Sequence, residues 1–423
     1  MDFTDTFALV VKPGTIRIVL QLANSHAWSV HQMDVSNAFL HGHLDEQVFC
    51  QHPTGFVDPT CPDQVCLLSR SLYGLKQASR TWYQRIAMFL RQLGFCSTRS
   101  DASLFIYRQG ADTTYLLLYV DDMILTACTH ELLCQLTDRL RAEFTIKDLG
   151  SLHYFLGVEV VRRPDGFFLH QRKYAHELLD RVGMLNCKPT ATHVDTKAKL
   201  SATDGSPASD VAFYKSTVGA LQYWTAVKRI LRYIRGAMDL GPTLRASTAI
   251  DLVAYSDADW VGCPNTHRPT SGYCIFLGPS LVSWSSKRQP TVSRSSAEIE
   301  YRVVANVVAD CSWLRQLLHE LSCPVGKATV VYCDNVSTVY LSVNPVHHHR
   351  VGERNRKRKR YENVVDVVEH LHDLTDPSTK QTAPPSSAHV QLDDVPRTPI
   401  QQSFTREFRQ HDGVMTVMML LQT

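Results

Sequence analysis

The sequence has almost no excess charge of either sign, because 44 Lys and Arg residues stand against 41 Asp and Glu residues, a net charge of +3 over 423 residues. Any affinity for nucleic acid must then come from local basic patches. No two of the 12 cysteines have the Cys-x-x-Cys spacing, which favours reduced thiols in a cytosolic or nuclear protein. The N-terminus has acids at Asp2 and Asp5 but no apolar signal core, and no run approaches the roughly 18 apolar residues of a membrane span. We expect neither secretion nor membrane insertion.

The composition is that of a folded chain, with 44% hydrophobic and 20% charged residues. At about 100 to 200 residues per domain, the length predicts two or three domains. Apolar runs alternate with helical patterns up to about residue 245, which predicts an α/β core. The clearest elements expected there are strands over 28–34, 115–120 and 123–127 and a helix over 78–93. Asp121 and Asp122 then lie at the tip of a hairpin.

A second α/β unit is expected after a boundary near Gly241, beyond a polar linker over 200–207. Its expected elements are a strand over 252–257, a hairpin around 278–280, a helix over 296–321 and a strand over 328–334. Past Pro345 come three histidines over 347–349 and a basic run over 354–360. From about residue 373, Pro, Ser, Thr and Gln dominate, and we expect that tail to be largely disordered.

Three carboxylates, Asp34, Asp121 and Asp122, each lie at the end of a strand-like run, where a sheet could bring them together. Two hard cations about 4 Å apart need shared carboxylates of this kind, and Mg²⁺ suits a set of oxygen ligands. The alternative is that paired Asp residues simply form a turn.

The sequence around these acids resembles the polymerase of copia-type long-terminal-repeat retrotransposons, as found in plants. Five segments carry the resemblance in order along the chain: Gln32–Leu44, Ser71–Ala78, Tyr119–Asp122, Lys147–Gly150 and His153–Val158. The resemblance implies an RNA-directed DNA polymerase that uses an RNA template, a DNA primer and deoxynucleoside triphosphates.

Carried over residue by residue, the resemblance makes Asp34 and Asp121 metal ligands and Asp122 the third carboxylate. Phe39 would lie under the sugar of the incoming nucleotide, where an aromatic ring excludes a 2′-hydroxyl. Gln77 would contact the incoming nucleotide or the template, and Lys147 would lie near the departing phosphates. Read without the resemblance, Phe39 is core packing and Lys147 is a solvated side chain before a turn.

The second unit resembles the ribonuclease H domain that follows this polymerase, through Tyr255–Trp260, Ser295–Tyr301 and Cys333–Asn335. Asp257, Glu298 and Asp334 come from three separate elements and could converge on two metals that hydrolyse RNA in RNA/DNA hybrids. Ser295 and Glu298 also fit a capping box, in which the glutamate serves the backbone. Glu300 is then the alternative ligand, and because the two glutamates lie about 200° apart on a helix, only one can face the site.

The implied fold class is α/β (α+β), a right-hand-type polymerase palm followed by a ribonuclease H-like mixed-sheet domain. Two Mg²⁺ are expected at each site, with Mn²⁺ able to substitute, and localisation in a cytoplasmic particle with import into the nucleus. The expected units are the palm and partial fingers at 1–175, a truncated thumb and connection at 176–245, the ribonuclease H-like domain at 246–350 and an atypical basic, then disordered, tail at 351–423.

The sequence departs from the family pattern at three places, and these departures give three alternatives for the activity of this chain. The resemblance implies that a part of the fingers that holds the triphosphate lies upstream of Asp2 in the family, and we expect this chain to lack it. A longer helical stretch is missing around Leu221–Thr225, and after His349 the sequence no longer follows the family. The alternatives are an active polymerase with ribonuclease H, a nucleic-acid-binding remnant without turnover, and ribonuclease H activity alone.

Overall fold

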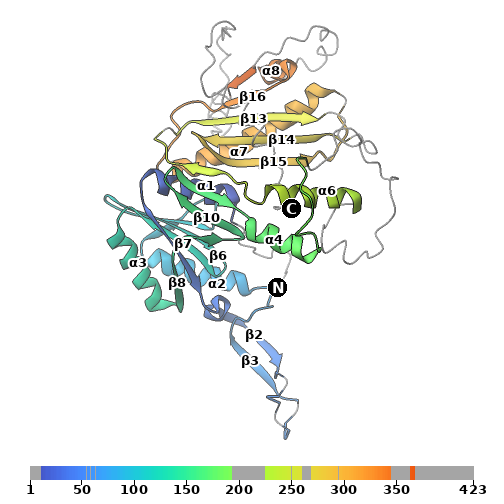
Figure 1. The fold of residues 1–423 in the computed structure, drawn as a ribbon. Helices are drawn as coiled ribbons and strands as arrows, with labels where there is room; N and C mark the ends of the chain where they lie inside the picture. Colours follow the sequence, from blue (N-terminus) through green and yellow to red (C-terminus); the bar gives the residue numbers. More distant parts are fainter. Residues whose placement is uncertain are drawn as a thin grey trace, which may run out of the picture.

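The computed structural model describes residues 11–53, 55–57, 59–61, 63–192, 224–248, 250–259, 268–293, 295–343 and 363–366 (Figure 1). Several sequence predictions lie outside these residues: the linker at 200–207, the start of the join at 221–225, the histidines at 347–349, the basic run at 354–360 and the tail from 373. Among the described helices, none has the length and apolar character that crossing a bilayer requires.

The first unit is built on a six-stranded sheet with the order β4-β5-β6-β7-β1-β8. Its strands are β1 (Ser29–Val35), β4 (Phe95–Ser97), β5 (Leu104–Gln109), β6 (Asp112–Tyr119), β7 (Asp122–Ala127) and β8 (Ile146–Ser151). Both faces of β6 are buried: Leu116 and Leu118 pack under α2 (Ala78–Gln92) and α3 (His130–Glu143), while Tyr115 and Leu117 join a separate cluster on the other face. This double burial explains the unbroken apolar run in the sequence, since side chains alternate between the faces.

A smaller four-stranded sheet has the order β12-β11-β10-β9 and bridges two of the expected units. Its strands are β9 (Tyr154–Phe155), β10 (Val158–Arg163), β11 (Gly166–His170) and β12 (Thr243–Arg245). β12 pairs with β11, and α4 (Arg172–Arg181) packs against α6 (Trp224–Ala237) through Leu179 and Ile234. The expected boundary at residue 175 therefore does not separate two independent sheets.

The second unit has a five-stranded sheet with the order β15-β14-β13-β16-β17. Its elements are β13 (Leu252–Asp259), β14 (Thr270–Leu277), β15 (Ser280–Arg288), α7 (Ser296–Glu320), β16 (Val330–Cys333), α8 (Val336–Val343) and β17 (Asn363–Asp366). β13 runs antiparallel to β14 and parallel to β16, so the sheet is mixed, as predicted. β17 pairs with β16, which extends this sheet beyond the boundary expected at residue 350.

One apolar core is shared by the two larger sheets, beside the separate cluster that the first sheet forms with α2 and α3. Helix α1 (Pro13–Ser25) lies between them, and its residues Ile18 and Leu22 share one cluster with Leu117 of the first sheet and Ile275 of the second (Figure 1). Hydrogen bonds cross the same junction. Arg17 is buried, donates to the Val282 carbonyl at 3.0 Å and has its guanidinium 3.6 Å from the Trp284 ring centre. The two units are therefore fixed against each other by a continuous apolar core.

The carboxylate of Glu320, the last residue of α7, forms hydrogen bonds across the junction between the two units. It accepts hydrogen bonds from the backbone N–H of Arg99 at 2.7 Å and from the N–H and hydroxyl of Ser100 at 3.2 and 2.6 Å. We expect Glu320→Ala to lower the free energy of unfolding by about 1–3 kcal/mol, because these donors lose their acceptor. Chemical denaturation measures this. Asp138→Ala, at a carboxylate whose side chain is 76% exposed, is the control and should change stability little.

A two-stranded hairpin, β2 (His43–Gln51) and β3 (Val65–Arg70), projects from the first unit (Figure 1). Its base is closed where the Ser71 N–H donates to the Gly42 carbonyl at 2.9 Å. Phe49 and Leu67 face each other across the strands, and both are 57% exposed. The hairpin therefore presents apolar side chains to solvent.

Candidate active sites

The first set of acids lies on β1, on β7 and in the turn between β6 and β7. Among the described residues their carboxylate oxygens do not all come within 4.8 Å of one another. Asp34, near the end of β1, lies directly opposite Asp122, the first residue of β7. Asp121 lies in the turn between β6 and β7, and its carbonyl accepts a 2.8 Å hydrogen bond from the Val35 N–H. The hairpin with acids at its tip is therefore present, and the sheet aligns it with Asp34.

The electrostatics of this group show that the three carboxylates share one environment. The pKa of Asp122 is raised to about 6, first by burial and then by the negative charges of Asp121 and Asp34. The same two acids, after burial, raise the pKa of the Tyr73 phenol. A site that disfavours its own negative charge suits a cation, which would relieve the repulsion.

The turn that carries Asp121 has an unusual backbone. Val120 adopts φ 53°, a left-handed conformation that is strained for a β-branched residue. Its carbonyl accepts a 2.6 Å hydrogen bond from the indole Nε1–H of Trp82. Trp82 is a residue of α2 on the buried face of the helix and is 1% exposed. Trp82 thus stabilises the strained turn through this hydrogen bond from the core.

We expect Trp82→Phe to lower the free energy of unfolding by about 1–3 kcal/mol, because the Val120 carbonyl loses its donor. If the turn positions Asp121 for catalysis, the variant should also lose turnover of primer extension while its KM for nucleotide changes little. Thermal unfolding and steady-state extension measure the two effects. Trp28→Phe, at the opposite end of β1 from Asp34, is the matched control and should keep its turnover. Equal turnover in both variants would show that the Trp82 hydrogen bond is structural only.

Of the three residues predicted to bind nucleotide, Lys147 lies opposite one of the acids in the sheet, and Phe39 contacts Tyr73, whose pKa the acids affect. Lys147 on β8 is exposed. In the register of β1 and β8 it lies opposite Asp34, on the other side of β1 from Asp122. Phe39, in the short 3-10 helix η1 (Ala38–His41), lies with its ring 4.5 Å from that of Tyr73. Gln77 is half-buried at the N-terminus of α2, and its backbone carbonyl accepts from the Thr81 N–H.

Tyr73 is a residue beside the acids that the sequence analysis does not single out. It lies in the motif Ser71–Ala78, from which the resemblance assigns only Gln77 as a nucleotide contact. Tyr73 is 54% exposed, and its ring lies beside that of Phe39. The charges of Asp121 and Asp34 contribute, after burial, to the raised pKa of its phenol. The position in the motif was the available signal.

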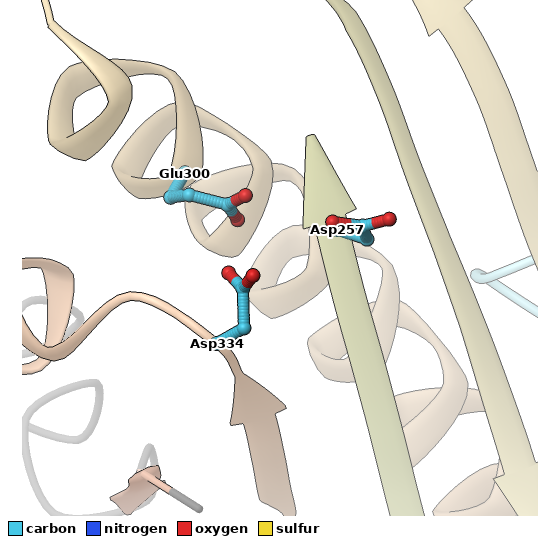
Figure 2. Close-up of side chains that lie close together, drawn as sticks. All are labelled: Asp257, Glu300 and Asp334. Carbon is cyan, nitrogen blue, oxygen red and sulfur yellow. The ribbon is translucent and has the colours of Figure 1, made fainter. Parts of the chain in front are cut away.

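The second set of acids forms a tighter group. Oxygen atoms of Asp257, Glu300 and Asp334 all lie within 4.8 Å of one another, and among the described residues this is the one set of three or more acidic, His or Cys side chains with that spacing. Figure 2 shows the Glu300 and Asp334 carboxylates pointing toward each other, with Asp257 beside them on β13. Each acid comes from a different element: a strand, the start of α7, and the connection from β16 to α8.

The local sequence explains how Asp334 is held. Asn335 directly precedes α8, and its side-chain oxygen accepts from the backbone N–H groups of Ser337 and Thr338 at 3.0 and 3.3 Å. The Thr338 hydroxyl then donates to the Ala297 carbonyl of α7 at 3.2 Å. The two helices that flank the site are thereby tied together, which fixes Asp334 relative to Glu300.

Of the two glutamates, the structure brings Glu300 to the aspartates, and the expected position of Glu298 in the cluster is corrected. Glu298 lies on another side of α7, where its carboxylate pairs with Arg302 at 2.7 Å. Its N–H donates to the Ser295 hydroxyl at 3.2 Å, so the Ser295 half of the predicted capping box is present, while the Glu298 carboxylate is paired with Arg302. Asp257 and Asp334 both lie in the cluster with Glu300.

Glu300 is 3% exposed, and its Oε2 atom has no hydrogen-bond partner. Burial raises its pKa to about 8, with smaller contributions from Asp334 and Asp257. A buried, unpartnered carboxylate oxygen beside two further carboxylates is costly in a bare protein and is what a divalent cation would satisfy. The donor set is all oxygen, which fits Mg²⁺ or Mn²⁺.

The raised pKa of Glu300 predicts a pH-dependent stability. Because its folded pKa lies near 8 and its ordinary value is 4.5, the folded protein binds more protons between these values, and stability falls as pH rises through this window. Glu300→Gln carries no charge and should therefore melt several degrees above the wild type above pH 8, with the difference vanishing near pH 4.5. Added Mg²⁺ should raise the melting temperature above pH 8 by more in the wild type than in Glu300→Gln, which keeps only the first set of acids as a cation site. A pH-independent difference would contradict this account.

Comparison with known proteins relates the chain to one family. Residues 1–196 match the family described as reverse transcriptase (RNA-dependent DNA polymerase). The chain is 40% identical over 414 residues to the Retrovirus-related Pol polyprotein from transposon RE2 of Arabidopsis thaliana, covering 90% of this chain and 28% of that protein. It is 34% identical over 386 residues to the corresponding polyprotein from transposon TNT 1-94 of Nicotiana tabacum, covering 83% of this chain and 29% of that protein.

The chain thus spans 28–29% of the length of these curated relatives. A solved structure, that of the foamy viral protease-reverse transcriptase dRH in complex with ds DNA, aligns with 78% of this chain and 55% of its own at 13% identity. Its TM-score of 0.21 is too low to support an argument about fold. On the sequence matches, the chain belongs to the reverse transcriptase family of copia-type retrotransposon Pol polyproteins.

Proposed function

We propose that the first unit is an RNA-directed DNA polymerase whose active site contains Asp34, Asp121 and Asp122. The observation that carries the proposal is the register of β1 and β7, which sets Asp34 directly opposite Asp122 beside the turn that holds Asp121. Its substrates would be an RNA template, a DNA primer and deoxynucleoside triphosphates.

Asp34 and Asp121 would hold two Mg²⁺ ions, with Asp122 as the third carboxylate. The ions, when bound, would activate the primer hydroxyl and neutralise the leaving pyrophosphate. The chain's own residues surround this position: Phe39 and Tyr73 form an aromatic surface next to the acids, and Lys147 projects from the neighbouring strand. An aromatic surface beneath the sugar would leave little room for a 2′-hydroxyl, and Lys147 would stabilise charge on the departing phosphates.

The test is primer extension on an RNA template with Mg²⁺ and then with Mn²⁺. Template-dependent extension by the purified full chain would support the proposal. Binding of primer and template without extension, from protein with a cooperative unfolding transition, would leave the alternative of a remnant that binds nucleic acid without turnover.

We propose a second activity, hydrolysis of RNA in RNA/DNA hybrids, for the unit built on β13 to α8. It is supported by the convergence of Asp257, Glu300 and Asp334 and by the unpartnered Oε2 atom of Glu300. The three acids would hold two divalent cations, which would activate water and stabilise the leaving 3′-oxygen. Cleavage of a hybrid, with the same RNA as single strand as the control, tests this activity separately from polymerisation.

A further inference from the structure

The projecting hairpin contains two cysteines that lie directly opposite each other. Cys50 of β2 pairs with Cys66 of β3 in the antiparallel register, between the pairs Phe49 with Leu67 and Gln51 with Val65. Both cysteines are free thiols and half-buried. Side chains that face each other across a ladder project from the same face of the hairpin, so the two thiols are neighbours.

The ladder alone sets a separation that suits a disulfide. Directly opposite residues in antiparallel strands have Cα atoms about 4.5 or 5.5 Å apart, depending on which kind of pair they form. Disulfides span Cα separations of about 4.4–6.8 Å, so either kind of pair lies in the permitted range. The pairing alone therefore permits the bond without a rearrangement of the fold.

A histidine adjoins this pair. His52 follows two residues after Cys50, and both of its ring nitrogens lie 3.5 Å from the Cys66 sulfur. A neutral imidazole at this distance can accept the thiol proton as Cys66 becomes the reactive thiolate. The chain holds a matched comparison in Cys134 of α3, whose sulfur lies 3.5 Å from Nε2 of His130 and is exposed, but which has no cysteine facing it across a ladder.

We propose that Cys50 and Cys66 form a reversible disulfide, with a hydroperoxide as the oxidant and His52 as the residue that accepts the Cys66 proton. The Cys66 thiolate attacks a peroxide oxygen, so that an S–O bond forms, the O–O bond breaks and the departing hydroxide takes the proton from His52 to leave as water. The Cys50 thiol then displaces the hydroxyl group of the Cys66 sulfenic acid, which leaves as a second water. Two thiols and one hydrogen peroxide thus give one disulfide and two waters, with both sulfurs oxidised and both peroxide oxygens reduced.

The bond would fix the hairpin next to the stretch where its register is irregular. The register of β2 and β3 is irregular between His43 and Val48, and the strands carry exposed Phe49 and Leu67 on the opposite face from the cysteines. A cross-link two positions beyond Val48 would prevent the strands from slipping past each other, and a thiol reductant would release them. The proposal concerns only the hairpin and stands whether or not either active site turns over.

The experiment treats the reduced full chain with one equivalent of hydrogen peroxide, blocks remaining thiols by alkylation and maps the cysteines by mass spectrometry. Because there is no Lys or Arg between Arg17 and Arg70, trypsin leaves Cys50, Cys61 and Cys66 on one peptide. A protease that cleaves before aspartate cuts at Asp58 and Asp63 and separates all three. We expect a reductant-sensitive link between the Cys50 and Cys66 peptides, and trapping of Cys134 only as a sulfenic acid adduct.

Three variants make the result specific. In Cys50→Ser, Cys66 should accumulate as sulfenic acid; in Cys61→Ser, the link should form as in the wild type. His52→Gln should slow disulfide formation at least about tenfold, whereas His130→Gln should leave it unchanged. The proposal fails if Cys50 and Cys66 are oxidised or alkylated independently, like Cys134, or if Cys66 links to Cys61 instead. An unchanged rate in His52→Gln would overturn the role of the histidine.

Discussion

Replacing both acids of the turn, Asp121→Asn with Asp122→Asn, removes primer extension by the chain, with an expected loss of at least about 10³-fold. The metal ions of a phosphoryl-transfer site stabilise the transition state by several kcal/mol, and each 1.36 kcal/mol is a factor of ten in rate. Asparagine keeps the size and the turn-forming ability of aspartate but not the charge. The measurement is single-turnover extension with saturating Mg²⁺ and nucleotide.

Stability separates this effect from misfolding. Because burial and its neighbouring acids raise the pKa of Asp122 to about 6, its charge at pH 7 is held at a cost to the folded state. The double variant should therefore melt at or above the wild-type temperature while extension is lost. Asp112→Asn, at the other end of β6 from the turn, is the matched control and should extend normally. Extension by the double variant at the wild-type rate would place the polymerase chemistry elsewhere.

The hairpin and the helix of the six-stranded sheet were predictable because their signals are local. An apolar run of strand length, the acid pair and a second apolar run predict a hairpin, and the structure has β6 ending at Tyr119 and β7 beginning at Asp122. Likewise, a periodic apolar face ended by Gly94 predicts the helix α2, which spans Ala78–Gln92. Asp34 could not be placed by these signals, since its partner Asp122 lies 88 positions away along the chain and only the sheet order aligns them.

The contacts between the two units could not be predicted from the sequence either, because they also join residues that lie far apart along the chain. Arg17 and Val282 are separated by 265 positions and Glu320 and Ser100 by 220, and nothing in either local sequence shows that the segments meet. The sequence predicted separate units, each with its own core. The structure instead places α1 between the two sheets in a shared core, because the apolar side chains on this face of the first sheet are covered by the second unit.

The choice between Glu298 and Glu300 shows where sequence reasoning stops. A cap at Ser295 and helical geometry together establish that only one of the two can face the site, but either choice satisfies them. The decision depends on which side of α7 is packed against β13 and β16, a tertiary contact. Glu300 lies on the buried side and Glu298 on the side shared with Arg302.

A pair of single variants on this helix therefore gives the sharpest test of the second site. We expect Glu300→Gln to lose cleavage of an RNA/DNA hybrid by at least about 10³-fold, because it removes a buried carboxylate from the cluster with Asp257 and Asp334. Glu298→Gln makes the same chemical change two residues earlier and should cleave within a few-fold of the wild type. The readout is the rate of hybrid cleavage under single-turnover conditions.

The two glutamates differ in the environment of their charge, so the two variants have different expected effects. Glu298 pairs with Arg302 near the surface, and such a pair contributes about 1 kcal/mol or less to stability. Glu300 holds its charge in a buried place where only a cation would offset it. Loss of cleavage in Glu298→Gln together with activity in Glu300→Gln would reverse the assignment. Primer extension should persist in both variants, since the first site lies on a different sheet, and its loss in either would mean that the shared core couples the two sites.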